Sequence, residues 1–185
     1  MRILLLGSNG QLGKELERQL SSVANVAAFP RESLDITNHK AVRDAVRCVH
    51  PDIIVNAAAY TAVDKAEADA EFAHAVNADA VANLAKIARE QNLWLFHYST
   101  DYVFDGSKQS PYLDTDTPNP INVYGASKLA GETAIVTANC QHLIFRTTWV
   151  IGKDGHNFAK TILRLASERD ALKVIDDQIG VPTSP

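Results

Sequence analysis

Three glycines near the N-terminus constrain this chain more than any other feature of its sequence. Gly7, Gly10 and Gly13 follow the apolar run Ile3–Leu6 and open a segment in which leucines recur at helical spacing. Such a run is typical of a strand buried on both faces of a parallel sheet. The G-x-x-G-x-x-G spacing predicts a tight turn, a close approach of a pyrophosphate to the backbone, and close helix–strand packing. We interpret the loop as a dinucleotide site at a helix N-terminus, the alternative being a glycine-rich turn without a ligand.

The rest of the chain alternates between strand and helix patterns. Apolar runs that predict further strands lie at 26–29, 53–55, 93–98, 143–147 and 173–175. Helical patterns lie between them, including a long alanine-rich helix over 71–91 and a helix with Asn38 as its N-cap. Strands separated by helices of this length form βαβ units with right-handed crossovers. We therefore predict an α/β protein with a doubly wound parallel sheet of the Rossmann type.

The composition excludes several classes of function. The chain has 185 residues and a net charge of -4, which disfavours a nucleic-acid partner because neutralising phosphates requires a basic face. With two cysteines and six histidines that lack metal-ligand spacing, we expect no disulfide scaffold, no metal, and a reducing, cytoplasmic environment. The N-terminal apolar run is too short for a signal peptide or a membrane span, so no membrane partner is expected.

The end of the second predicted strand indicates which cofactor the glycine loop would bind. An acidic residue there would favour NAD by accepting hydrogen bonds from the free 2′-hydroxyl of the adenosine ribose. This sequence has Pro30 and Arg31 instead. Arg31 could pair with a 2′-phosphate, which predicts NADPH, with NADH also possible. The alternative is an Arg31 side chain that points into water. Asp35 and Ile36 follow where adenine contacts are expected.

A tyrosine and a lysine further along the chain are the candidate catalytic pair. Tyr124 and Lys128 are one helical turn apart and would share a face, although such a pair can also be merely exposed. A lysine cation about 5 Å away, at an effective dielectric of about 20, contributes about 3 kcal/mol, or roughly two pKa units. We therefore expect Lys128 to bring the phenol toward working pH, with burial opposing part of the shift. Thr100 and Asp101 end the fourth predicted strand, at the edge where such sheets bind ligands.

Five segments carry a resemblance to a known family. They are Gly7–Gly13, Asn56–Asp64, His97–Phe104, Asn122–Lys128 and Arg146–Val150. With them the chain resembles the extended short-chain dehydrogenase/reductase family. The resemblance implies a nicotinamide cofactor and reduction of the 4-keto group of a nucleotide-linked 6-deoxyhexose, in the synthesis of cell-surface polysaccharide. A sugar-nucleotide epimerase or dehydratase, or a non-catalytic nucleotide-binding subunit, is the alternative, and a homodimer is a possible assembly.

The resemblance also implies roles for individual residues. Thr100 would bond the keto oxygen, Tyr124 would donate the proton, and Lys128 would hold the nicotinamide ribose. Together with those named above from the residues themselves, the expected cofactor-binding residues are Gly7, Gly10, Gln11, Leu12, Gly13, Arg31, Asp35, Ile36, Ala59, Tyr60, Thr61, Tyr98, Tyr124 and Lys128. Those expected to contact the sugar nucleotide are Val63, Thr100, Asp101 and Trp149.

Two features depart from the family pattern, and one residue stays ambiguous. Ile151 stands where a tyrosine is expected. Family members also continue into a domain that closes over the substrate. We therefore expect residues 1–150 to form the NAD(P)-binding domain, residues 151–185 to be a last strand–helix unit and the beginning of a substrate domain, and the chain to be truncated. Asn77 on the long helix could brace the site or be a simple polar helix residue.

Overall fold

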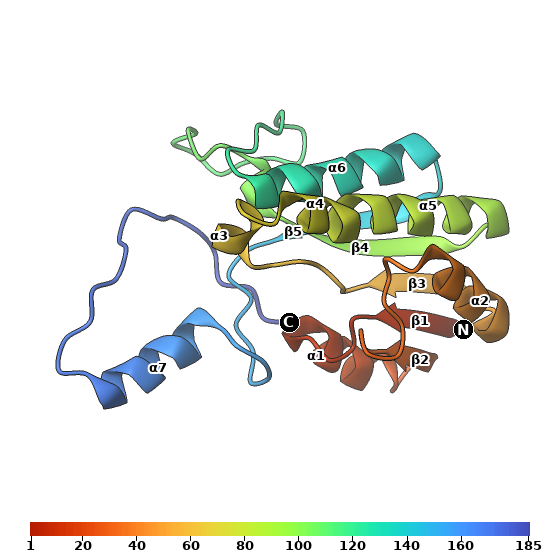
Figure 1. Ribbon diagram of the computed structural model, residues 1–185, viewed down its shortest axis with the longest axis horizontal. Coiled ribbons are helices and arrows are strands. Elements are labelled where there is room, and N and C mark those ends of the chain that lie inside the picture. The colour runs from red at the N-terminus through yellow and green to blue at the C-terminus, as the bar shows by residue number, and fades with distance from the viewer.

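The computed structural model describes residues 1–185 and has at its centre a five-stranded parallel sheet in the order β2-β1-β3-β4-β5 (Figure 1). The strands are β1 (Arg2–Leu6), β2 (Asn25–Phe29), β3 (Ile53–Asn56), β4 (Trp94–Thr100) and β5 (Gln141–Thr147). Every neighbouring pair is parallel, so all carboxyl ends lie at one edge. The chain order reverses direction between β1 and β3, where sheets of this kind bind ligands. The predicted fold class is confirmed.

Helices connect the strands and cover both faces of the sheet. They are α1 (Gln11–Leu20), α2 (His39–Val49), α3 (Val63–Ala66), α4 (Ala70–His74), α5 (Ala80–Gln91), α6 (Val123–Ala138) and α7 (Phe158–Glu168). The Asn38 side chain accepts a hydrogen bond from the Ala41 N–H at 3.0 Å, which confirms the predicted cap of α2. The long predicted helix is interrupted by a π-helical turn, Ala75–Asp79, between α4 and α5. None of the helices has the length and apolar content needed to cross a membrane.

One face of the sheet carries most of the core. Leu4, Leu6, Ile54 and Leu95 are fully buried there against α2, α5 and α6. On the opposite face, a smaller cluster around Leu5 packs against α1. Figure 1 shows this division, with α5 and α6 above the sheet and α1 below it. β1 and β3 are buried on both faces and are therefore continuous apolar runs, whereas on β5 the side chains of Leu143 and Phe145 remain exposed.

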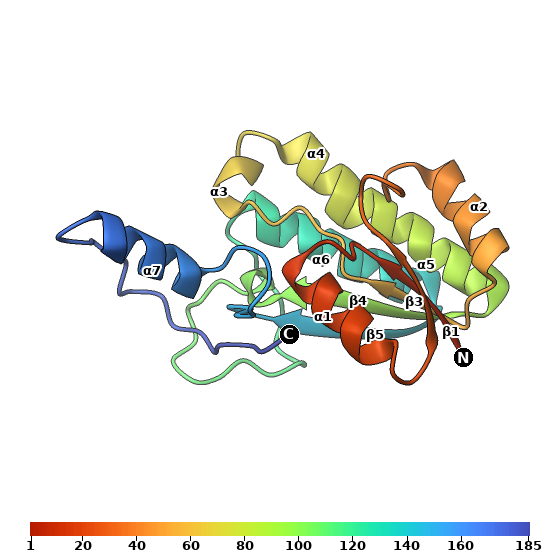
Figure 2. The same cartoon turned by 90° about the horizontal axis from the view of Figure 1, so that it is seen from below.

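The C-terminal segment differs from the sequence-based expectation. The predicted strand at 173–175 is wrong, because these residues have no regular structure and Ile175 is exposed. Figures 1 and 2 show α7 standing away from the sheet, with the following chain returning to end beside α1. The return is held by a single parallel bridge between Val150 and Thr183. An apolar run without a neighbouring strand to accept its backbone hydrogen bonds cannot form a ladder.

Candidate functional site

The glycine loop between β1 and α1 has no room for side chains at two of its three glycines. Gly7 has a φ of +78°, and a Cβ there would lie 2.7 Å from the Ala58 nitrogen. A Cβ on Gly13 would lie 2.1 Å from the Gly7 carbonyl oxygen. Gly10 is the N-cap of α1 and has no side-chain cap, so the first N–H groups of the helix face an open loop. This is the backbone arrangement that a phosphate requires.

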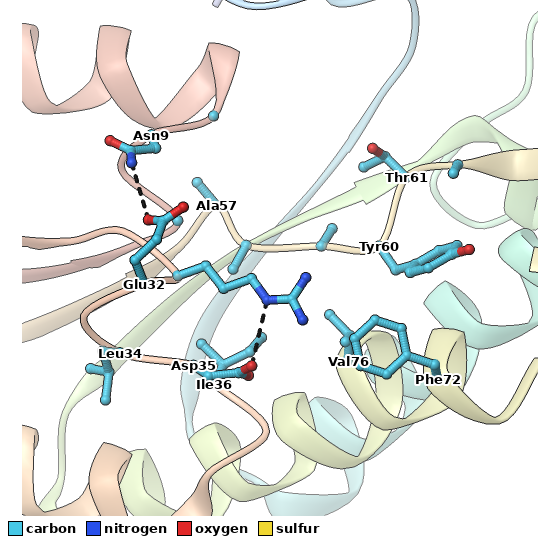
Figure 3. A pocket seen from close by; sticks show the side chains of 16 residues that line it. Asn9, Glu32, Leu34, Asp35, Ile36, Ala57, Tyr60, Thr61, Phe72 and Val76 are labelled. Carbon is cyan, nitrogen blue, oxygen red and sulfur yellow. Dashed lines mark hydrogen bonds and ion pairs between the residues drawn. The ribbon is translucent and has the colours of Figure 1, made fainter. Parts of the chain in front are cut away.

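A cavity of about 320 Å³ opens beside this loop and brings together much of the predicted cofactor site (Figure 3). It lies among the carboxyl ends of β1, β2 and β3 and is closed on one side by α4. Eight predicted cofactor residues line it: Gly7, Gly10, Arg31, Asp35, Ile36, Ala59, Tyr60 and Thr61. The cavity therefore corresponds to the adenosine and pyrophosphate end of the expected site.

Arg31 lies inside the cavity mouth and remains available to a ligand. Its side chain is 68% exposed, its Nε lies 3.5 Å from Asp35 Oδ2, and its guanidinium lies 5.3 Å from the centre of the Phe72 ring. The guanidinium therefore lies between the Asp35 carboxylate and the Phe72 ring, both of which Figure 3 labels among the residues that line the cavity. Hydrogen bonds from the hydroxyl and the N–H of Thr37 lower the pKa of Asp35, with a smaller contribution from Arg31. The guanidinium is thus oriented by its neighbours without being buried by them.

Thr100, Tyr124 and Lys128 come together where β4 ends and α6 begins. Tyr124 and Lys128 occupy successive turns of the buried face of α6, with exposures of 8% and 1%. Gly125 lets this helix approach the end of β4 closely, because a Cβ there would lie 2.1 Å from the Tyr102 carbonyl oxygen. The predicted helical spacing of the pair is confirmed, and both side chains are buried rather than merely exposed.

Burial governs the proton affinities of this pair, and one prediction is wrong here. Burial raises the pKa of Tyr124, and a hydrogen bond with Thr100 offsets only part of the rise. Burial also lowers the pKa of Lys128 to about 8. Lys128 does not lower the pKa of Tyr124 in this structure, because its Nζ turns toward β4. There it donates to the Tyr98 carbonyl oxygen at 2.6 Å and lies 3.3 Å from His97 Nε2.

The π-helical turn places Asn77 between the cavity wall and α6. Asn77 Oδ1 accepts from the Tyr60 N–H at 2.9 Å, and its Nδ2 donates to the Tyr60 carbonyl and to Ser127 Oγ, both at 3.0 Å. The Ser127 hydroxyl in turn donates to the Tyr124 carbonyl at 2.7 Å. The sequence left open whether Asn77 supports the site or is a simple polar helix residue. The structure favours the first, because these hydrogen bonds link the cofactor cavity to the catalytic helix.

Two predicted cofactor residues direct their side chains away from the cavity. Gln11 Nε2 donates to the Val150 carbonyl at 2.6 Å, and its Oε1 accepts from Asn157 Nδ2 at 2.8 Å. The Gln11 side chain therefore ties the glycine loop to the segment that follows β5. The Tyr98 ring stacks on Phe145 at 5.3 Å on the α1 face of the sheet, so only its backbone carbonyl faces Lys128.

The remaining predicted residues surround the catalytic set or lie beside it. Asp101 Oδ1 accepts from the Thr100 hydroxyl at 3.1 Å. Val63 packs against the cluster that contains Tyr124. Trp149 follows β5 with a φ of +43° and is 45% exposed. Leu12 is half-buried in the first turn of α1 and does not line the cavity.

Some residues of the site had no place in the sequence-based prediction. Glu32 lines the cavity and accepts from Asn9 Nδ2 at 3.2 Å, and Phe72 closes the side opposite it. Glu32 could have been found because it directly follows Arg31 at the strand end. Phe72 could not, because α4 reaches the cavity only through tertiary packing. His97 was assigned no role, since a lone histidine on a strand carries no spacing signal.

Comparison with known proteins relates the whole chain to one family. The model of the RmlD substrate binding domain matches residues 1–185. The chain is 54% identical over 187 residues to the dTDP-4-dehydrorhamnose reductase of Escherichia coli K12 and 52% identical over 187 residues to that of Salmonella typhimurium. Each alignment covers 99% of this chain and 62% of the relative. The chain therefore spans less than two thirds of the length of these relatives.

Solved structures agree with this relationship. The crystal structure of dTDP-4-dehydrorhamnose reductase from Bacillus anthracis in complex with NADP superposes with a TM-score of 0.95 at 42% sequence identity. The match covers 99% of this chain and 66% of that one. A UDP-glucose 4-epimerase from Thermus thermophilus, with a TM-score of 0.78 and 22% identity, shares the fold alone.

Proposed function

We propose that this chain, which belongs to the RmlD substrate binding domain family, is an NADPH-dependent dTDP-4-dehydrorhamnose reductase. It would reduce dTDP-4-dehydro-L-rhamnose to dTDP-L-rhamnose for the synthesis of surface polysaccharide such as O-antigen. The observation that carries the proposal is the buried set of Thr100, Tyr124 and Lys128, which lies on the same sheet edge as the cavity that holds Arg31. The names of the relatives support the choice of substrate.

The residues of the cavity fit the proposed cofactor. Gly7 and Gly13 leave no space for a Cβ, so backbone N–H groups can approach a pyrophosphate. The exposed guanidinium of Arg31 suits a 2′-phosphate, to which it can present two parallel donors. The complex of the Bacillus anthracis relative with NADP supports the same choice. The Glu32 carboxylate can accept hydrogen bonds from ribose hydroxyls, which supports use of NADH as well.

The catalytic set can complete the reduction of a keto group. Bound NADPH supplies the hydride that is transferred to C4 of the sugar. Tyr124 donates its phenolic proton to the C4 oxygen as negative charge develops there. Thr100 holds the Tyr124 hydroxyl and contacts the same oxygen. Lys128, a cation below a pH of about 8, would hold the nicotinamide ribose.

The alternatives fit these residues less well. A dehydratase would be expected to place an acid–base pair of carboxylates after β4, but here Asp101 is followed by Tyr102. A binding subunit without turnover would not need a buried tyrosine next to a threonine and a lysine at the cofactor edge. The reductase therefore accounts for more of the structure than either alternative.

Several features of the complete protein belong to the same proposal. We place the cofactor-binding domain at residues 1–150 and the beginning of the substrate domain at 151–185. We expect Asp101 and Trp149 of the first domain to contact the sugar nucleotide. A homodimer and a cytoplasmic location remain predictions.

A substrate comparison tests the proposal. NADPH oxidation should require dTDP-4-dehydro-L-rhamnose and should not occur with dTDP-glucose, which has no keto group. Tyr124→Phe should lower kcat by about 100-fold or more while NADPH binding is retained, because general acid catalysis contributes that much. Near-normal turnover by Tyr124→Phe in the complete protein, or no NADPH oxidation by the complete wild-type protein, would contradict the proposal.

A further inference from the structure

A buried hydrogen-bond chain joins β3, β4 and α6, and the mechanism above leaves its central member without a role. His97 on β4 is completely buried, with its Nδ1 3.1 Å from Asn56 Nδ2 on β3. Its Nε2 lies 3.3 Å from Lys128 Nζ on α6. The imidazole thus bridges the amide at the end of β3 and the catalytic lysine.

The Asn56 amide determines which nitrogen of His97 carries the proton. Asn56 Oδ1 accepts from the Ala58 N–H at 3.2 Å, so the amide turns its NH₂ group toward His97. An amide NH₂ can only donate, and Nδ1 must therefore keep its lone pair. Burial, followed by the Lys128 charge, lowers the pKa of His97 well below its usual value, so the ring is neutral. Its single proton then belongs on Nε2.

That proton points at Lys128. An ammonium group can only donate, whereas a neutral amine can accept the Nε2–H and still donate to the Tyr98 carbonyl at 2.6 Å. The neutral amine is therefore the form of Lys128 that satisfies every partner in this chain. The one carboxylate that raises the pKa of Lys128 is Glu132 of α6, and it is already paired with Arg146 of β5 at 2.6 Å.

We propose that His97 is a positioning residue for Lys128. Asn56 holds the His97 ring as its Nε2–H tautomer, and this N–H points at Lys128 Nζ as a hydrogen-bond donor. The donor favours the neutral amine and so lowers the proton affinity of Nζ. The consequence for catalysis rests on the proposed function. If reduction needs the Lys128 cation, the alkaline limit of the reaction is set jointly by burial and by a histidine that touches neither substrate nor cofactor.

The tautomer is the first test and needs no activity. In protein labelled with ¹⁵N-histidine, long-range ¹H–¹⁵N spectra at about pH 9, where Lys128 is mostly the neutral amine, should show a protonated Nε2 and an unprotonated Nδ1 for His97. A protonated Nδ1, or an imidazolium with both nitrogens protonated, would overturn the proposal. The reductase assay is independent of this spectrum. If the assay fails but the spectrum shows the Nε2–H tautomer, only the proposed function is refuted. If the assay succeeds but the spectrum shows another protonation state, only this inference is refuted.

Two variants test the effect on Lys128, whose titration can be followed through its ¹³Cε shift and assigned with Lys128→Arg. His97→Leu removes the donor and should raise the pKa of Lys128 by about one unit, the size expected for one hydrogen bond. Asn56→Asp keeps an acceptor for the Ala58 N–H and replaces the amide donor with a carboxylate, which accepts a hydrogen bond from a His97 Nδ1–H. It should move the ring proton to Nδ1 and also raise the pKa of Lys128.

His142→Leu is the matched control, because His142 on β5 bonds only the Cys140 carbonyl, at 2.8 Å. It should leave the titration of Lys128 unchanged. If His97→Leu does not fold, the wild-type spectrum and Asn56→Asp decide the question. An unchanged pKa of Lys128 in a folded Asn56→Asp protein whose ring proton has moved to Nδ1 would overturn the proposal.

Discussion

Burial of Lys128 opposes its proposed role, because burial disfavours the cation that would hold the nicotinamide ribose. Its pKa falls from 10.5 to about 8 in the folded protein, so between these pH values the unfolded chain binds more protons than the folded one. Stability should therefore rise with pH across this window, by about 3 kcal/mol in total. Below pH 8 that increment is absent, because the folded state then has to hold a buried cation.

This gives a prediction for Lys128→Met. The variant should lose the rise in the free energy of unfolding between pH 8 and 10.5, and near neutral pH it should be at least as stable as the wild type. Urea denaturation at several pH values measures this. Lys86→Met is the control, since that side chain is 67% exposed and should leave the pH dependence unchanged. Identical pH dependence in Lys128→Met and the wild type would refute the assigned shift.

Arg31 should decide the preference between the two cofactors. Arg31→Ala should weaken NADPH binding by about tenfold or more, as expected for a lost charge-assisted pair, and should change NADH binding little. Isothermal titration with both cofactors measures this. Arg47→Ala is a matched control, because its side chain is equally exposed, at 68%, and also pairs with a nearby aspartate. An unchanged ratio of the two affinities in Arg31→Ala would exclude the 2′-phosphate role.

The sequence allowed the glycine and Arg31 positions to be predicted because their roles depend on short offsets along the chain. A Cβ on Gly13 would meet the backbone of Gly7 and Ser8, which lies nearby in every strand–turn–helix unit of this type, and the positive φ of Gly7 belongs to the turn itself. The proton affinities of Tyr124 and Lys128 could not be predicted in the same way. Their direction depends on burial and on where Lys128 Nζ turns, which His97 and the Tyr98 carbonyl decide from a distant part of the sequence.

At the scale of elements, the contact between α6 and the π-helical turn positions the catalytic pair. Gly131 is buried on α6, and a Cβ there would lie 2.2 Å from the Asn77 carbonyl oxygen. Gly131→Ala should push α6 away from the turn, destabilise the protein by about 1–3 kcal/mol, and lower kcat. Thr133→Ala, at an exposed position of the same helix, should have a small effect. Denaturation midpoints and turnover measure both, and a fully active, stable Gly131→Ala protein would contradict this role.

The strands and most helices followed from periodicity, while two elements did not. The π-helical turn depends on Asn77 finding Tyr60 and Ser127, which are remote in the sequence. The apolar run at 173–175 resembled a strand locally but has no neighbouring strand to pair with. In both cases a tertiary partner, or the lack of one, decides the structure that local propensity leaves open.

At the scale of the whole molecule, strand order locates the site. The sheet order β2-β1-β3-β4-β5 places the glycine loop at the switch point, the Arg31 cavity on the β2 side and the Tyr124–Lys128 set on the β4 side. A dinucleotide that spans the carboxyl edge would reach both. This much was predictable, because parallel connectivity fixes which loops share an edge. The cavity wall formed by α4 was not, because it requires the packed tertiary structure.

In the proposed reaction, a hydride is transferred to C4 of a keto sugar at this edge of the sheet, and Tyr124 supplies the proton. The most direct measurement is reduction of dTDP-4-dehydro-L-rhamnose with NADPH deuterated at the transferred position, followed by NMR of the product. We expect dTDP-L-rhamnose with deuterium at C4 and at no other carbon, formed by the wild-type protein and lost with Tyr124→Phe. Deuterium retained in the cofactor, or found at another carbon of the sugar, would contradict it.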